Sequence, residues 1–214
     1  MKKVKEYFIE LSLIVLGVFI AISVDDYREK SKIRSMVSSY LSVLKKDLNE
    51  NLKLLNEEIY YDSIALNRLG TMRNRVNAQN YEGLDSLAFH LGEHSSFAIN
   101  DTGFRMIVES GNSHTLETEK LAQLTNLFGA TMTDLKFYQD ADYDNVKRGI
   151  DFFQKHYPHI SDRIRQANSS ISTELTHAVM SRLISMELEF QQKKKVKKKI
   201  LDVLTFVDED IILN

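Results

Sequence analysis

The sequence contains no cysteine, no tryptophan and only one proline among its 214 residues. The absence of cysteine excludes disulfide bonds, thiolate metal sites and cysteine nucleophiles. One proline and eight glycines supply too few chain breaks for a many-turned β-sandwich or barrel, whereas long helices need few. A formal net charge of -2 gives the chain no general attraction to nucleic acid. We therefore expect a mostly helical protein that does not bind nucleic acid.

The most apolar stretch lies near the N-terminus. Twelve of the 17 residues from Phe8 to Val24 are Leu, Ile, Val or Phe, and Glu10 is the one ionisable residue among them. On an insertion scale these apolar side chains contribute about -5 kcal/mol, against less than about +3 kcal/mol for a Glu away from the membrane midplane. The stretch therefore predicts an N-terminal transmembrane helix, with residues 1–27 as a membrane anchor and the lipid bilayer as a partner.

Two other interpretations of this stretch remain open. A helix buried in a soluble core is one, although no other segment is apolar enough to surround it. A signal peptide cleaved after Ser23 is the other, which Glu10 and the bulky residues before the cleavage position oppose. Lysines and arginines flank the stretch on both sides, so their count does not fix its orientation. We expect a membrane protein that spans the membrane once, with the short N-terminus in the cytoplasm.

Within the stretch, Glu10, Gly17 and Ala21 fall on nearly one helical face. The two small residues allow a second helix to approach closely, and a carboxylate at membrane depth usually faces protein or water. This face predicts self-association of the chain as a homo-oligomer. The alternatives are a Glu10 that reaches the nearby interface, and a Glu10 that lines the path of an oligomeric channel or transport complex.

The rest of the chain has the spacing of long helices. No proline or glycine occurs from Asp25 to Leu69, and apolar residues recur there with an eleven-residue repeat, which predicts one long helix to about Val76. Shorter helices are expected over 84–94 and 101–110. Further helical patterns run from about Thr118 to Pro158 and from Ile160 onward. The predicted fold is all-α: a transmembrane helix that continues into an elongated antiparallel helical bundle over residues 28–214.

The N-terminal sequence from Glu10 to Glu29 resembles a family of uncharacterised bacterial single-pass membrane proteins that carry a domain of unknown function. The resemblance includes Val24-Asp25-Asp26-Tyr27-Arg28. A central segment with Thr102-Gly103-Phe104 and Glu109-Ser110-Gly111 is similar to the same family. The family commonly has Asn and Trp where this chain has Asp26 and Tyr27. The resemblance implies an N-terminal membrane helix and a helical domain, and it brings no activity, cofactor or catalytic residue.

Two motifs resemble metal sites. His90-Leu91-Gly92-Glu93-His94 matches the inverted zinc-protease motif, and Glu174 is a possible third ligand, which makes a zinc metalloenzyme an alternative function. Gly92 weakens the helix that this spacing requires, and such proteases have a large α/β domain that this helical chain cannot build. Asp140, Asp142, Asp144 and Asp151 imitate a calcium loop, but the helical apolar pattern continues across them. We therefore predict no metal, no cofactor and no enzymatic activity.

The densest charge run lies near the C-terminus. Six lysines surround Val196 and are predicted either to contact anionic lipid or to form a solvated helix face: Lys193, Lys194, Lys195, Lys197, Lys198 and Lys199. The sequence thus predicts a membrane-anchored helical scaffold or sensor, with an unknown protein partner.

Overall fold

The computed structural model describes the backbone of residues 2–157, 159–167 and 169–213, and the side chains of residues 12–157, 159–164 and 170–208. Every regular element in these ranges is helical, which confirms the all-α class. The α-helices are α1 (Lys2–Asn77), α2 (Leu84–Ala88), α3 (Thr102–Glu109), α4 (Thr118–Thr125), α5 (Met132–His156), α6 (Ile160–Ala167) and α7 (Ser169–Leu213). The shorter turns are the 3-10 turns η1 (Phe89–Leu91) and η2 (Ser113–Thr115), and the π-helical turn η3 (Asn126–Thr131).

Helix α1 is a single rod of 76 residues. At 1.5 Å per residue it is about 114 Å long. It passes without a break through the predicted boundary between residues 27 and 28. The first buried residue along it is Val37, and the eleven-residue repeat that begins there supplies its packing face, with Leu41, Leu44, Leu48 and Leu55 fully or nearly fully buried. The predicted long helix is therefore confirmed. Among its described side chains the buried ones begin at Val37, and the half-buried Ile33 packs against the same core one turn earlier.

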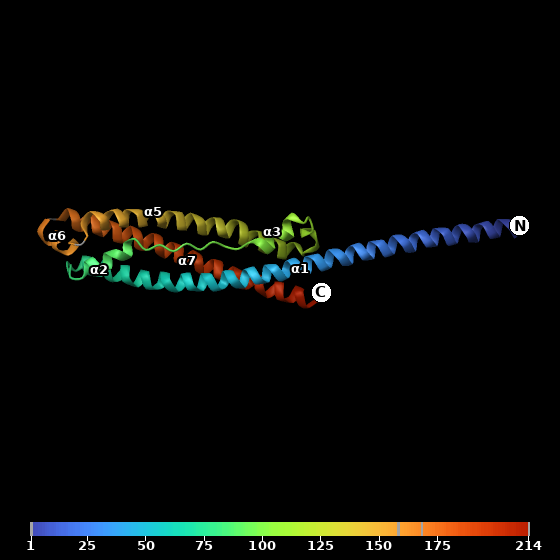
Figure 1. Cartoon of the computed structure of the whole chain (residues 1–214), viewed down its shortest axis with the longest axis horizontal. Coiled ribbons are helices and arrows are strands. Elements are labelled where there is room, and N and C mark those ends of the chain that lie inside the picture. The colour runs from blue at the N-terminus through green and yellow to red at the C-terminus, as the bar shows by residue number, and fades with distance from the viewer. Residues whose placement is uncertain (1, 158, 168, 214) are drawn as a thin grey trace.

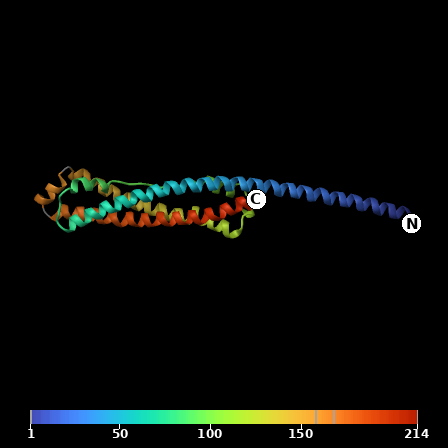
Figure 2. The ribbon, with the colours of Figure 1, turned by 90° about the horizontal axis from the view of Figure 1, so that it is seen from below.

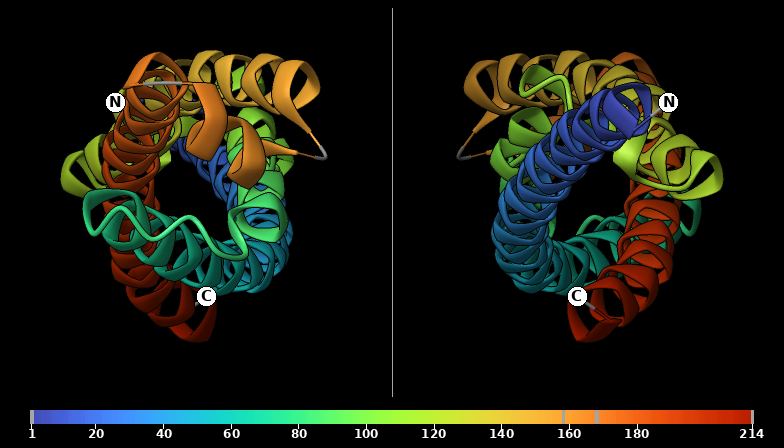
Figure 3. Two further views of the ribbon diagram at one scale, coloured as in Figure 1. Left: turned by 90° about the vertical axis from the view of Figure 1, so that its left-hand side faces the viewer. Right: turned by 90° about the vertical axis from the view of Figure 1, so that its right-hand side faces the viewer.

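Three long helical segments form the bundle (Figure 1). Helix α7 packs against both α1 and α5 and runs antiparallel to them (Figures 1 and 2). Helices α1 and α5 run in the same direction, because the chain returns between them through residues 92–101, which form no helix. This return differs from the simple antiparallel order expected from the sequence. Viewed along the long axis, the helices surround a common centre (Figure 3).

The bundle has two apolar cores along its length. The first lies towards the end from which α1 projects and includes Leu44, Ile107, Leu127 and Val203. The second lies near the opposite end, next to α2 and α6, and includes Leu69 and Leu175. Between the two cores, buried polar and charged side chains replace apolar ones. This interval is where the structure departs most from the sequence expectation.

The N-terminal part of α1 projects beyond the bundle (Figure 1). A search of the residues with described side chains finds no helix that is both long and apolar enough to cross a membrane. The apolar stretch of the predicted anchor begins at Phe8, four residues before the first described side chain, Ser12. The transmembrane prediction is therefore not supported by this search.

Candidate functional site

The projecting part of α1 carries a run of exposed apolar side chains. Its exposed members are Leu13, Ile14, Val15, Leu16, Val18, Phe19, Ile20, Ile22 and Val24. The side chains of Ile14 and Phe19 are each 65% exposed. Successive residues of a helix point about 100° apart, so the four from Leu13 to Leu16 cover every side of the rod. This segment, residues 13–24 of α1, is called the apolar rod below.

The predicted helix-packing residues lie on this rod or just before it. A Cβ at Gly17 would meet no heavy atom within 4 Å, so the space beside it is open. Ala21 is exposed one turn further along the same face. The side chain of Glu10 lies outside the described residues. The small-residue face therefore has open space for another helix, and no described residue of the chain occupies it.

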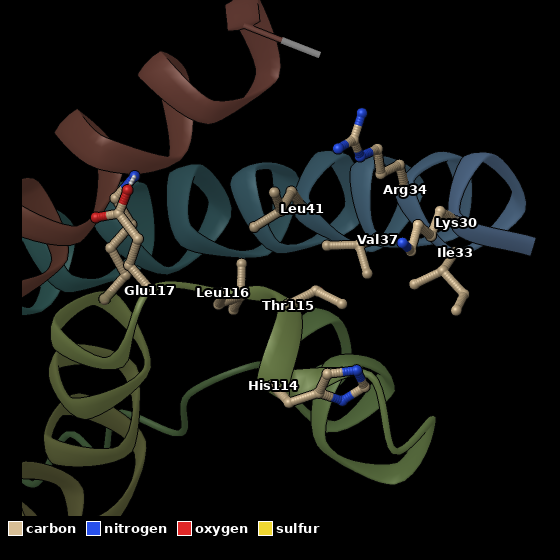
Figure 4. Close-up of a pocket in the computed structure, with 10 residues that line it drawn as sticks. Lys30, Ile33, Arg34, Val37, Leu41, His114, Thr115, Leu116 and Glu117 are labelled. Carbon is tan, nitrogen blue, oxygen red and sulfur yellow. Dashed lines mark ion pairs between the residues drawn. The ribbon is translucent and has the colours of Figure 1, made fainter. Parts of the chain in front are cut away.

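A shallow hollow lies where α1 enters the bundle (Figure 4). Its volume is about 390 Å³. Leu41 and Leu116 point toward one another across it, and Val37 lies beside them (Figure 4). Lys30 lies on the α1 side and His114 on the opposite wall. The hollow joins an apolar floor to a basic rim just beyond the apolar rod.

The strongest cluster of ionisable groups is inside the bundle. Five side chains between the two cores are each less than 5% exposed and make up what we call the charged layer: Asp62 of α1, Asp142 of α5, and Arg182, Glu189 and Lys193 of α7. The layer holds three carboxylates and two cations. The half-buried Glu58 borders the layer, and so does Ser95 of the non-helical segment 92–101, which we call the chain return. Buried charges of this kind require partners, and the structure provides them from all three long helices.

Lys193 is the centre of one half of the layer. Its Nζ lies 2.8 Å from Asp62 Oδ2 and 2.9 Å from Glu189 Oε1, and it donates a hydrogen bond of 3.1 Å to Ser95 Oγ. The Lys193 side chain is completely buried. The prediction that Lys193 contacts anionic lipid is therefore wrong. A lysine run covers almost two helical turns, so one member of it must face the bundle interior.

The other lysines of the run differ in their surroundings. Lys194 and Lys195 are exposed, and the Lys194 ammonium lies 4.0 Å from the centre of the Phe190 ring. Lys199 donates a hydrogen bond of 2.6 Å to Thr131 Oγ1 at the π-helical turn. Lys197 is half-buried and Lys198 is exposed. Lys193, the first lysine of the run, contacts Asp62 of α1, which is 38 residues beyond Val24, or about 57 Å along the helix. Charges screened over about 8 Å do not reach across that distance.

Asp142 is the centre of the other half of the layer. Its Oδ1 accepts hydrogen bonds from Arg182 and, at 2.6 Å, from Ser185 Oγ. Its Oδ2 lies 3.4 Å from His94 Nδ1. Burial raises the pKa of Asp142, but His94, Arg182 and Ser185 outweigh that effect and hold the pKa below its ordinary value. The Asp142 carboxylate is therefore ionised at neutral pH.

Glu189 lies between the two halves. Burial raises its pKa to about 7, although the Lys193 ammonium opposes the shift, and the negative charges of Asp142 and Asp62 add to it. Burial also disfavours the charged form of Lys193, but Glu189 and Asp62 outweigh this and raise the pKa of Lys193. Lys193 is thus charged, whereas Glu189 is partly protonated near neutral pH.

The zinc-protease motif does not form. The 3-10 turn η1 ends at Leu91, so His90 and His94 are not on one helical face. His90 Nδ1 instead lies 2.8 Å from Glu93 Oε2. Glu174, the suggested third ligand, pairs with Lys155 at 3.0 Å. The prediction of a helix that continues to His94 is therefore wrong, because the chain after Gly92 is not helical.

The acidic set on α5 forms no calcium loop. Asp140 pairs with Lys136 at 3.2 Å and Asp144 pairs with Lys147 at 3.6 Å, each within a continuous helix. Asp142 points inward to the charged layer, and Asp151 is exposed. The helical interpretation of this segment is confirmed.

Sequence reasoning missed the charged layer as a unit. Asp62, Arg182 and Glu189 carried no motif. Asp62 and Arg182 pair with Lys193 and Asp142, which lie 131 and 40 residues away along the chain, whereas Glu189 pairs with Lys193 four residues further along α7. Comparisons of the chain with family models, with curated proteins and with solved structures find no match in any of the three. The resemblance of the N-terminal region to bacterial single-pass membrane proteins therefore stays a prediction.

Proposed function

We propose that this chain is a membrane-anchored helical scaffold or sensor without enzymatic activity, which self-associates through the N-terminal part of α1. The observation that carries the proposal is the apolar rod, whose side chains are exposed on every side of the helix. A protein partner covers one face of a helix, whereas a bilayer surrounds it. Apolar exposure on all sides therefore favours hydrocarbon as the surrounding medium.

The residues next to the rod fit a membrane interface. Tyr27, three residues after Val24, is 75% exposed, and amphipathic aromatic rings favour this depth. Arg28, Lys30 and Arg34 follow within about 15 Å of the end of the rod along the helix. The basic rim of the hollow at Lys30 and His114 thus has the position of a lipid headgroup layer.

The shape of the molecule supports a role in positioning. If the rod lies in a bilayer, α1 extends about 80 Å from Val24 to Asn77. The bundle then packs against the part of α1 that is distant from the bilayer. The charged layer and the second core are then far from the lipid. Such a rigid extension presents a surface at a defined distance from the membrane, which is what a scaffold or sensor requires.

The open face at Gly17 and Ala21 supports self-association. Small residues spaced four apart allow helix backbones to approach closely in lipid. The space beside Gly17 is not filled by any described part of the chain. We propose that a second copy of the same helix occupies this space. We also propose that the chain spans a bacterial inner membrane, with its N-terminus in the cytoplasm.

Vesicle flotation with charged variants tests the anchor. We expect the full-length chain to float with liposomes at alkaline pH. The double variant Leu16→Arg with Ile20→Arg places two charges in the rod, at about 2.5–3.5 kcal/mol each on the insertion scale, and is expected to stay at the bottom of the gradient. Ile184→Arg with Leu188→Arg is the matched control, because both residues are exposed on α7, far from the rod. Equal flotation of both double variants would contradict the proposal.

A further inference from the structure

We propose that His94, Asp142 and Glu189 form a binding site for a divalent first-row transition-metal ion such as Zn²⁺. One ligand atom from each side chain lies within 4.8 Å of the other two. The three residues come from three separate segments: the chain return, α5 and α7. The site lies inside the bundle and does not depend on the membrane proposal.

The donor atoms fit this class of ion. One imidazole nitrogen and two carboxylate oxygens are ligands that Zn²⁺, Mn²⁺ and Fe²⁺ accept. Ca²⁺ and Mg²⁺ prefer sets made of oxygen alone, so His94 makes the site a poor one for either. The three protein ligands leave at least one coordination position for water, as in open zinc sites.

The spacing of two ligands already matches a bound ion. His94 Nδ1 and Asp142 Oδ2 are 3.4 Å apart. Two ligands at about 2.1 Å from a tetrahedral metal are about 3.4 Å from each other. The same separation is long for a direct N–H···O hydrogen bond. The separation of this pair therefore fits a bound ion, and the three ligand atoms of the site lie within 4.8 Å of one another.

Neighbouring groups hold the two carboxylates in place. Arg182 and Ser185 both bind Oδ1 of Asp142, which leaves Oδ2 directed at His94. Lys193 lies beside Oε1 of Glu189. Ligands of protein-bound metals are commonly oriented by such outer hydrogen bonds and charges. Arg182 therefore acts on the Asp142 oxygen that the ion does not need.

The charges of the layer favour an added cation. Three buried carboxylates face two buried cations, and the carboxylate of Glu58 lies 3.4 Å from Lys193 as well. The buried Glu189 Oε1 accepts no hydrogen bond from any described residue, because the nearby Lys193 ammonium is poorly aligned with it. A divalent ion bound by Glu189 and Asp142 compensates this excess of negative charge.

Among the three ligands, His94 is the one in contact with solvent. The His94 side chain is 20% exposed and lies next to the Tyr143 ring, whereas Asp142 and Glu189 are buried. An ion can therefore enter along His94 and bind the two carboxylates behind it. Binding would add a link between the chain return, α5 and α7 to the contacts already present, such as the hydrogen bond from Lys193 to Ser95.

Zinc titration of the full-length chain tests the site. The tag-free protein is first treated with a chelator, and Zn²⁺ is then added in a calorimeter. We expect one Zn²⁺ per chain, with no competition from Mg²⁺ or Ca²⁺. His94→Ala and Glu189→Gln are each expected to weaken binding at least about tenfold, because each removes a direct ligand. With Co²⁺ as the probe, the visible absorption of a low-symmetry site should be present in the wild type and lost in His94→Ala.

His90→Ala is the matched control, because His90 lies four residues from His94 and pairs with Glu93 outside the site. It should bind Zn²⁺ as tightly as the wild type. The wild type binding no Zn²⁺, or His90→Ala losing as much affinity as His94→Ala, would overturn the proposal. Helix content measured by circular dichroism checks that each variant is folded. If Glu189→Gln does not fold, the comparison of His94→Ala with His90→Ala decides the question, since both residues lie outside the long helices.

Discussion

The Nζ of Lys193 lies 2.8 Å from Oδ2 of Asp62 and joins α7 to α1 across 131 positions of sequence. Both side chains are almost completely buried. A buried ion pair adds little net stability, but the loss of one partner leaves the other charge without compensation. Because the pair is possible at only one alignment of the two helices, it fixes the position of α7 along α1.

Replacing this lysine is expected to be severe. Lys193→Met removes the partner of Asp62 and Glu189 and should lower the free energy of unfolding by about 3–5 kcal/mol. Lys194→Met is the control, because Lys194 is exposed and lies over the Phe190 ring, so a loss within about 1 kcal/mol is expected. Urea unfolding followed by circular dichroism measures both. Similar midpoints for the two variants would argue against a structural role for the charged layer.

Gly103 allows α3 to pack directly on α1. A Cβ at this position would lie 2.4 Å from the Leu44 backbone, so Gly103→Ala must push the helices apart. We expect a loss of about 1–3 kcal/mol in the free energy of unfolding. Gly70→Ala within α1 is the control. No heavy atom lies within 4 Å of its added Cβ, so it should gain about 0.5–1 kcal/mol from helix propensity. Thermal unfolding of the two variants should therefore shift in opposite directions.

Glu174 gives a prediction for acidic pH. Partial burial raises its pKa, but Lys155 and His156 outweigh this and lower the pKa below its ordinary value. The folded state then binds this proton less well than the unfolded state, so the contribution is present at neutral pH and is lost as the pH falls through the lowered pKa. Glu174→Gln should lower the unfolding free energy by up to about 1 kcal/mol at pH 7, since the pair is exposed, and by nothing in strong acid. A difference that grows on acidification would contradict this assignment.

The small-residue face predicts the effect of larger side chains on assembly. Gly17→Leu with Ala21→Leu should reduce cross-linked oligomers in membranes, because bulky residues keep the two backbones apart. Val15→Leu with Phe19→Leu has the same spacing on another face and serves as the control. Oligomers that survive the first pair of changes, or that are lost equally in both, would remove this face from the account.

Much of the fold follows from local pattern. The long helix to Asn77, the helices from Thr118 to His156 and the final helix were predictable, because apolar spacing near 3.6 residues per turn records which side of a helix is buried. The parallel course of α1 and α5 was not predictable. It depends on the chain return after Gly92, where contacts such as Asn100 Nδ2 to Asp47 Oδ1 at 2.9 Å replace helical hydrogen bonds.

The candidate metal site shows a different limit. His94 was singled out by its spacing from His90, but its partners in space are Asp142 and Glu189, which are 48 and 95 positions away. The sequence pattern places Lys193 at the surface, because a run of lysines is usually solvated. Local pattern gives the type of a side chain and its face on a helix, whereas burial and charge pairing depend on which helix packs against that face.

The depth of a probe on the apolar rod tests the central claim most directly. Since the chain has no cysteine, Phe19→Cys and Leu188→Cys each offer one site for a spin label. In liposomes, the label at position 19 should be accessible to oxygen, which concentrates in hydrocarbon, and protected from a water-soluble nickel complex, while the label at position 188 should show the reverse. A label at position 19 that is as accessible to nickel as the one at 188 would contradict the membrane anchor.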